Sequence, residues 1–359
     1  MSVFSRKERG VMNMEPTVQN ASSGRDAACS RPAHRSPQPC WLDHTAMALF
    51  RPWTMILALG FILTPTYWLL AALNTGAAFL KIGAGARPAA MGGAYTALAD
   101  DVNAIYYNPG ALARLRRQEL GATHAEWLLG TKFDFIGYAQ PTSLGTFGLG
   151  ITRLGVGSTE GRDANRQASG GFEASDTAYS FGLSRMLRQD ALFSGMTSVG
   201  VNLKRIESRI GAHSAGTWAC DFGGLHQFAG SRMSVGFSVL NAGPGMRFIS
   251  QEDPLPLTVA LGGAYRLGGA LNLALDVRQE VYDKRMEVGI GSEYSVMPGF
   301  AVRAGYMSNA RQAGGGGLTP LAGLGGGFGL KLGNYRADYT FTPFGELGNV
   351  QRLSLGMRW

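Results

Sequence analysis

The residues best suited to chemistry lie in a Gly- and Ala-rich stretch that follows the one long apolar segment of the chain. Asp100 and Asp101 are adjacent there, and carboxylates of this kind cap helices, pair with basic groups or bind cations. Gly83 and Gly85 do not make a dinucleotide-binding fingerprint, because Pro88 stands at the third glycine position and no βαβ pattern follows. We expect helix capping or ion pairing from the two aspartates, and neither a metal nor a cofactor.

Covalent catalysis lacks its usual local signatures. Only His124, His213 and His226 follow the apolar segment, and they are far apart in the sequence. No Gly-x-Ser-x-Gly elbow occurs, and the three cysteines form no Cys-x-x-Cys pair. Cys220 stands alone and is expected to pack as a small apolar residue. We expect that the protein is not an enzyme and has no catalytic residue. An outer-membrane hydrolase is the lesser alternative, since a Ser–His pair built across a barrel needs no local motif.

The composition is unusual for a soluble domain. Charged residues make up 16% of the 359 residues, against roughly 25% in a typical soluble protein. The 52 glycines are about twice the usual share, and they follow no three-residue period, which excludes collagen. The formal net charge is +8, but no Lys/Arg cluster is interleaved with aromatics. We therefore expect no nucleic-acid partner and assign the charge to lipid headgroups or solvated loops.

The apolar segment is expected to direct export. Residues 47–76 combine Arg51, an apolar run and a small-residue end, which predicts a secretory signal peptide. A retained transmembrane anchor is the alternative, because the run approaches the ~20 residues that span a bilayer. Residues 1–46 are polar and aperiodic, and we interpret them as an over-extended or disordered leader. An over-extended leader places the true start at Met47 or Met55, and a genuine disordered leader places it at Met1.

From residue 118 to residue 359 the sequence alternates with a period of two, which is typical of strands. Leu273 and Leu275 share one face of their segment, for example, while Asp276 and Arg278 share the other. The predicted strands are 118–129, 132–142, 145–157, 176–187, 197–210, 216–228, 233–243, 255–268, 271–284, 285–297, 300–309, 323–334, 335–344 and 350–359.

Alternation also occurs in soluble β-sandwiches. The length and number of the strands and the lengths of their connections must therefore distinguish a sandwich from a membrane barrel. The segments match the roughly 9–11 residues of a tilted strand that crosses a bilayer. Their number is even, as in single-chain outer-membrane barrels. The longest connections, 158–175, 244–254 and 310–322, are all odd-numbered, which predicts that they face the outside. We predict an all-β membrane protein of the bacterial outer membrane, a 14-stranded antiparallel transmembrane β-barrel over residues 118–359.

The last segment is suited to barrel assembly. Its apolar face ends on the terminal aromatic residue of the chain and consists of Leu353, Leu355, Met357 and Trp359. Barrel-assembly machinery typically reads such a final strand, so that machinery is an expected partner, together with outer-membrane lipid and lipopolysaccharide. An ordinary edge strand is the alternative.

Residues 77–117 are too apolar for a disordered tail and lack strand alternation. A barrel of fourteen strands lies between the filled eight-stranded barrels and the open porins, so its lumen needs a plug. We predict that residues 77–117 form an N-terminal plug inside the lumen. Asn108-Pro109-Gly110 predicts a tight turn there.

This stretch also resembles a known family. FLKIGAGARPAAMGGAYTALADDVNAIYYNPGAL, residues 79–112, looks like the N-terminal signature of the PorV/PorQ family, which is itself similar to the long-chain fatty-acid transporter (FadL-like) barrels. Family members usually have Asn-Pro-Ala-Gly-Leu where this chain has Gly110 before Ala111, and a small residue is common at Pro88. The signature residues carried over are Gly85, Arg87, Met91, Gly92, Gly93, Asp100, Asp101, Asn108, Pro109 and Gly110.

The resemblance implies a fourteen-stranded, non-enzymatic barrel and two possible functions. The first is an accessory or shuttle component of type IX-like protein secretion, which binds cargo proteins through extracellular loops such as 158–175 and works with a secretion translocon. The alternative is a FadL-like transporter of hydrophobic small molecules such as fatty acids. It needs an apolar pocket near the plug and a lateral opening, for which the Gly-rich strand 323–334 is the candidate.

Overall fold

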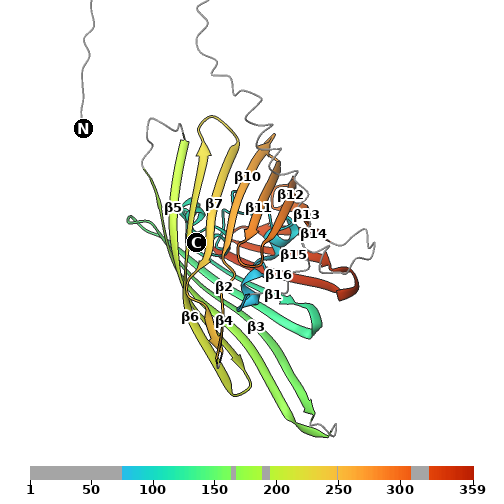
Figure 1. Ribbon diagram of the computed structural model, residues 1–359. Helices are drawn as coiled ribbons and strands as arrows, with labels where there is room; N and C mark the ends of the chain where they lie inside the picture. Colours follow the sequence, from blue (N-terminus) through green and yellow to red (C-terminus); the bar gives the residue numbers. More distant parts are fainter. Residues whose placement is uncertain (1–74, 163–166, 188–194, 249, 309–322) are drawn as a thin grey trace, which may run out of the picture. The chain divides into compact units, whose positions relative to one another are not determined.

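The computed structural model describes residues 75–162, 167–187, 195–248, 250–308 and 323–359. Within them, fourteen antiparallel strands close into one barrel, in which the first strand, β1 (Glu119–Glu126), pairs with the last, β16 (Asn349–Arg358) (Figure 1). The other wall strands are β2 (Thr131–Pro141), β3 (Thr146–Arg162), β4 (Ala168–Met186), β5 (Gly195–Ile210), β6 (His213–Phe228), β7 (Met233–Ala242), β10 (Thr258–Leu267), β11 (Leu271–Glu280), β12 (Arg285–Met297), β13 (Phe300–Met307), β14 (Leu324–Leu332) and β15 (Tyr335–Pro343). The predicted fourteen-stranded antiparallel barrel is confirmed.

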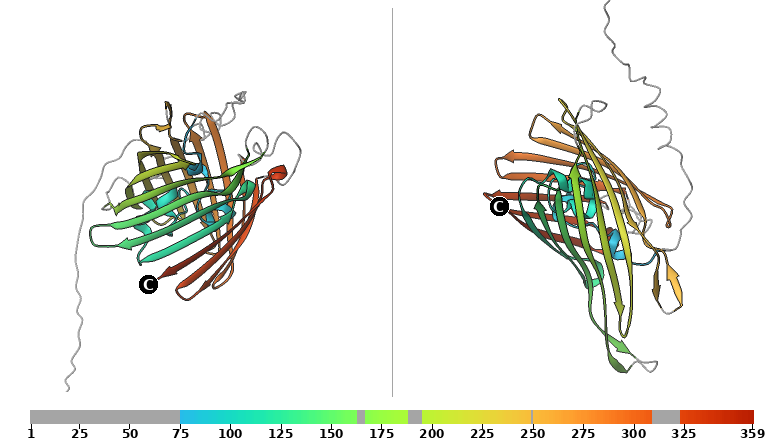
Figure 2. Two further views of the ribbon diagram at one scale, coloured as in Figure 1. Left: turned by 90° about the horizontal axis from the view of Figure 1, so that it is seen from below. Right: turned by 90° about the vertical axis from the view of Figure 1, so that its left-hand side faces the viewer.

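The clearest correction concerns the predicted loop 158–175. β3 runs to Arg162 and β4 begins at Ala168, so most of that segment is a paired extension of the two strands (Figure 2). Gly, Asn, Asp and Ser in this segment indicate a loop, but backbone pairing between adjacent antiparallel strands tolerates them. The connection 244–254 contains a small hairpin, β8 (Met246–Phe248) with β9 (Gln251–Asp253). The connection 310–322 lies outside the described residues, as do the predicted leader and nearly all of the signal peptide.

The wall has the reverse of a soluble protein's polarity. Leu273 and Leu275 are exposed on the outer face, whereas Asp276, one position on, is buried at 1% exposure. Outward-facing apolar side chains recur around the barrel: Leu149, Phe181, Val201, Phe222, Phe237, Leu261, Ile290, Val302, Phe328 and Leu353. Such an outer belt is suited to contact with lipid hydrocarbon. In water the same large apolar area would stay exposed to solvent, which is unfavourable. The predicted alternation is confirmed, and its polar side faces inward.

No helix in the described part of the chain has the length and apolar character to cross a membrane.

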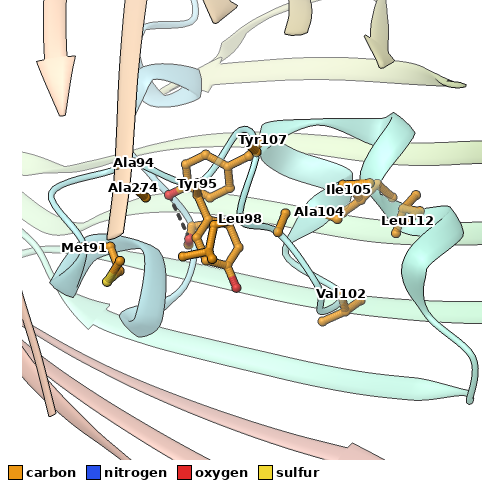
Figure 3. Packing of buried hydrophobic residues seen from close by; sticks show 14 of the residues in the cluster. Met91, Ala94, Tyr95, Leu98, Val102, Ala104, Ile105, Tyr107, Leu112 and Ala274 are labelled. Carbon is orange, nitrogen blue, oxygen red and sulfur yellow. Dashed lines mark hydrogen bonds between the residues drawn. The ribbon is translucent and has the colours of Figure 1, made fainter. Parts of the chain in front are cut away.

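The plug, residues 77–117, folds as short helical turns inside the wall. They are η1 (Ala78–Lys81), α2 (Ala86–Ala90), α3 (Ala104–Tyr107) and η2 (Pro109–Arg114). Tyr95, Ile105 and Leu112 are fully buried (Figure 3). They belong to one cluster with Phe133 and Phe135 of the wall. The apolar residues of the plug therefore form the core that an empty lumen would lack.

Glycines line the inner wall where the plug backbone passes closest. A Cβ on Gly305 would lie 2.2 Å from the backbone nitrogen of Gly92, and one on Gly200 would lie 2.4 Å from the carbonyl oxygen of Pro109. We call this set the glycine girdle: Gly121, Gly137, Gly148, Gly200, Gly223, Gly236, Gly262, Gly289, Gly291, Gly305 and Gly327. The glycine excess thus has a packing reason, because at these positions the plug backbone or a plug side chain takes the space that a Cβ would need.

Candidate functional site

Arg87 anchors the plug to the wall. Its guanidinium donates two hydrogen bonds to Glu293 of β12, at 2.7 Å and 2.9 Å, and one to the Tyr95 hydroxyl at 2.9 Å. It also pairs with Asp100. Because the fork of donors fits a carboxylate in two-point geometry, this contact fixes the orientation of α2 as well as its position.

The ion pairs continue along the inner wall. Glu293 accepts from Arg303 at 2.7 Å, and Arg303 donates to Asp338 at 2.7 Å. Arg336 pairs with Asp338 at 2.9 Å and returns to the plug at Asp101, 2.8 Å away. Opposite charges alternate along this buried line, so each buried charge has a counter-charge, as low-dielectric surroundings require.

Two plug groups show the electrostatic effect of these contacts. Burial favours the neutral form of Asp100, but the adjacent Arg87 guanidinium outweighs it and lowers the pKa of that carboxyl to about 2. Burial opposes the charge of Arg87 as well, yet Asp100 and Glu293 raise the pKa of its guanidinium well above the ordinary value. Both groups therefore stay ionised, and the contact between them persists, at neutral pH.

A second set of contacts holds the part of the plug around Tyr95, Thr96 and Asn108. Asp276 of β11 accepts from the backbone nitrogens of Tyr95 and Thr96, at 2.9 Å and 2.8 Å. The Asn108 side chain donates to the carbonyl oxygens of Thr96 and Gly224, at 2.8 Å and 2.9 Å. The inward carboxylate and the plug amide thus satisfy backbone groups of the plug and join the plug to β11 and β6.

The signature residues of the plug lie at its contacts with the wall and at its own turns. Asp100 and Asp101 pair with arginines, and Asp101 also accepts a hydrogen bond at 3.0 Å from the backbone nitrogen of Asn103, the N-cap of α3. Asn108 does cap η2, by accepting from Gly110 at 3.0 Å. Gly85, Gly92 and Gly93 have positive φ, and Met91 and Pro109 are buried against the glycine girdle.

The histidines and Cys220 lie apart from the plug's ion pairs. His124 hydrogen-bonds Asp134 at 2.7 Å on the outer face, and His213 and His226 stand at opposite ends of β6. Cys220 is a free, half-buried thiol. Within the residues described above, no group of three or more His, Cys, Asp or Glu is arranged to hold a metal.

A pocket of about 260 Å³ opens between plug and wall at one end of the barrel, which we call the mouth. The mouth carries the connections 127–130, 281–284 and 344–348, which the predicted orientation places outside the cell. Trp127 and Phe344 form one side of this mouth pocket, with ring centres 5.5 Å apart. The remaining lining is Ala78, Lys81, Ile82, Gly83, Ala89, Gly93, Tyr107, Arg278, Glu280, Arg285, Glu287, Met307, Thr342 and Arg352.

Sequence reasoning missed the pocket, although one signal was present. Arg352 alternates with the outward Leu353, which places it inside the barrel. Trp127 and Phe344 lie in connections, where no periodicity reports orientation. The predicted lateral opening at strand 323–334 is not seen in β14, which pairs with β13 and β15 without a register shift.

Comparison with known proteins supports the fold and leaves the activity open. A model of an uncharacterised protein family, UPF0164, matches residues 72–216, and no curated protein matches the chain. The PorV/PorQ resemblance is not among these matches.

The barrel is similar to the monoaromatic hydrocarbon channel CymD, with 12% identity, a TM-score of 0.51, and coverage of 77% of this chain and 98% of that one. A deltaS2S3 mutant of the monoaromatic hydrocarbon channel TodX gives 12% identity, a TM-score of 0.50, and 76% and 97% coverage. A Pseudomonas aeruginosa FadL homologue gives 11% identity, a TM-score of 0.44, and 74% and 95% coverage. The chain thus shares the closed-barrel fold of the CymD and TodX channels.

Proposed function

We propose that the protein is an outer-membrane channel that admits small hydrophobic molecules and first binds them in the mouth pocket. The observation that carries the proposal is the position of that pocket: its aromatic side, Trp127 and Phe344, lies at the mouth, between the plug and the wall. A concave, largely apolar site with a few polar groups is the usual form of a small-molecule site.

The outer belt supports membrane insertion. A closed barrel leaves no unpaired strand edge, and hydrocarbon offers no partner for a bare peptide group. The likeness of fold to CymD and TodX is consistent with a channel and carries no ligand with it. Export through residues 47–76 and residence in the outer membrane are part of the proposal, as is the absence of enzymatic activity.

The type IX-like secretion role stays a prediction drawn from the resemblance. No comparison supports it, one of its contact loops is mostly strand, and the other, 310–322, lies outside the described residues. Cargo proteins, a translocon, the barrel-assembly machinery and lipopolysaccharide remain predicted partners.

Uptake of a hydrophobic dye by Gram-negative cells tests the channel. Cells that express the wild-type protein should accumulate N-phenyl-1-naphthylamine faster than cells with an empty vector. Met307→Trp fills the mouth pocket and should remove most of the gain. Met286→Trp adds the same bulk on the outer face and should leave uptake unchanged.

Heat-modifiable migration in gels establishes that each variant has a folded barrel in the membrane. Equal uptake with wild-type protein and empty vector would overturn the proposal. Equal uptake with both tryptophan variants would remove the mouth pocket from the route.

A further inference from the structure

Arg352 is a cation of the mouth pocket to which the described residues supply no ion pair. It is 4% exposed, makes no hydrogen bond or ion pair to them, and its Nε is buried without a partner. Its guanidinium lies over the Trp127 ring, with Cζ 4.9 Å from the centroid. The stacked ring offsets part of the desolvation cost, but it satisfies none of the five N–H donors of the guanidinium.

The other basic groups that line the pocket have partners. Lys81 pairs with Asp283 and, at 3.4 Å, with Glu280. Arg278 donates to the Gly93 carbonyl and lies 3.5 Å from Asp276. Burial of a charged guanidinium costs free energy unless an anion pairs with it. The contrast indicates that Arg352 is available to bind an anionic ligand.

The surroundings of Arg352 fix the apolar part of such a ligand. Trp127 and Phe344 are edge-to-face at an interplanar angle of 67°, an arrangement that admits a further ring against them. The cavity of about 260 Å³ is less than twice an apolar cavity of about 150 Å³ that holds one benzene molecule. A single ring with a small head group fits that space, and a long alkyl chain is not enclosed by it.

Resting on the proposed function, we propose that the mouth pocket selects small amphipathic monoanions, namely a carboxylate attached to a single aromatic ring or to an apolar group of that size. Arg352 receives the carboxylate through two parallel N–H···O bonds, and Trp127 and Phe344 pack against the ring. Charge-assisted pairs of this kind are stronger and more directional than neutral hydrogen bonds. The channel therefore prefers an arylcarboxylate to a neutral molecule of the same shape.

Calorimetric titration of the purified, detergent-solubilised protein tests the preference, with benzoate and the neutral benzyl alcohol as probes. We expect wild-type protein to bind benzoate at least about tenfold more tightly than benzyl alcohol, since a charge-assisted bond contributes at least a tenfold factor. Arg352→Gln should abolish that preference and keep benzyl alcohol binding, and Arg352→Lys should restore part of it. Arg205→Gln is the matched control, because Arg205 also stacks on a tryptophan, Trp218, with Cζ 5.4 Å from the ring, but does not line the pocket.

The outcomes separate this inference from the proposed function. Equal binding of the two probes by wild-type protein, or an unchanged preference in Arg352→Gln, overturns the selection of anions while dye uptake by cells still supports the channel. Palmitate binding as tight as benzoate binding overturns the size limit. Loss of the preference in Arg205→Gln as well overturns the role assigned to Arg352. Absence of dye uptake overturns the channel itself.

Discussion

At the scale of single residues, Arg303 and Arg352 are both buried arginines of the inner wall with opposite surroundings. Arg303 pairs with Glu293 and Asp338, whereas Arg352 makes no ion pair with a described residue. Arg303→Met leaves Glu293 paired with Arg87 and Asp338 paired with Arg336, but it removes one charge-assisted hydrogen bond from each carboxylate. It should lower the free energy of unfolding by about 1.5–3 kcal/mol. Arg352→Met removes an unpaired charge and should leave that free energy unchanged or higher. Urea unfolding in lipid vesicles measures both, and a larger loss for Arg352→Met would contradict the assignment of charges.

Asp100 gives the plug a dependence on acid. Its pKa is about 2 in the folded protein and near 3.8 in the unfolded chain, so ionised Asp100 favours the folded state. Its contribution is complete above about pH 4 and is lost as the pH falls through about 2. Asp100 keeps a third of its side chain exposed, so solvent screening reduces the effect.

Hydrogen exchange of plug peptides, corrected for the intrinsic rate at each pH, checks this dependence. Wild-type protection should hold from pH 7 to pH 4 and fall between pH 4 and pH 2. Asp100→Asn should start lower and change less over the same range. Loss of protection already at pH 6 in the wild-type protein would show that another group controls the plug.

At the scale of elements, the glycine girdle makes the plug and the strands one packing unit. Gly305 of β13 faces the plug backbone at 2.2 Å from where its Cβ would be, whereas nothing lies within 4 Å of such an atom at Gly263 of β10. Gly305→Ala should therefore cost about 1–3 kcal/mol through overpacking, and Gly263→Ala should be close to neutral. Unfolding in vesicles gives both values. Equal effects would mean that plug and wall do not meet at the girdle.

At the scale of the whole molecule, the apolar belt predicts a dependence on depth in the bilayer. Leu275 lies in the middle of β11 and Leu267 at the end of β10, and both are outward and about half exposed. Arginine in place of Leu275 should cost about 2–4 kcal/mol, and in place of Leu267 about 0–1 kcal/mol. The free energy of unfolding in phosphatidylcholine vesicles measures the difference. No penalty at either position would show that the belt does not contact hydrocarbon.

The sequence by itself determined the strands, their number and the face that each presents, because these depend on a local period of two. Leu273 and Leu275 against Asp276 could be assigned without any knowledge of the neighbouring strand. The same locality placed the plug, since residues 77–117 are apolar and do not alternate. It misled at 158–175, where composition indicated a loop and pairing with an adjacent strand decided otherwise.

Only the tertiary structure decided the partners. Arg87 and Glu293 are 206 positions apart, and their contact depends on barrel closure, on register and on the path of the plug together. The mouth pocket has the same origin, because Trp127, Phe344 and Arg352 meet only when β16 pairs with β1. A sequence fixes which groups are charged or aromatic. Which of them is left without a counter-charge is a property of the whole set of neighbours, and that set exists only in the folded chain.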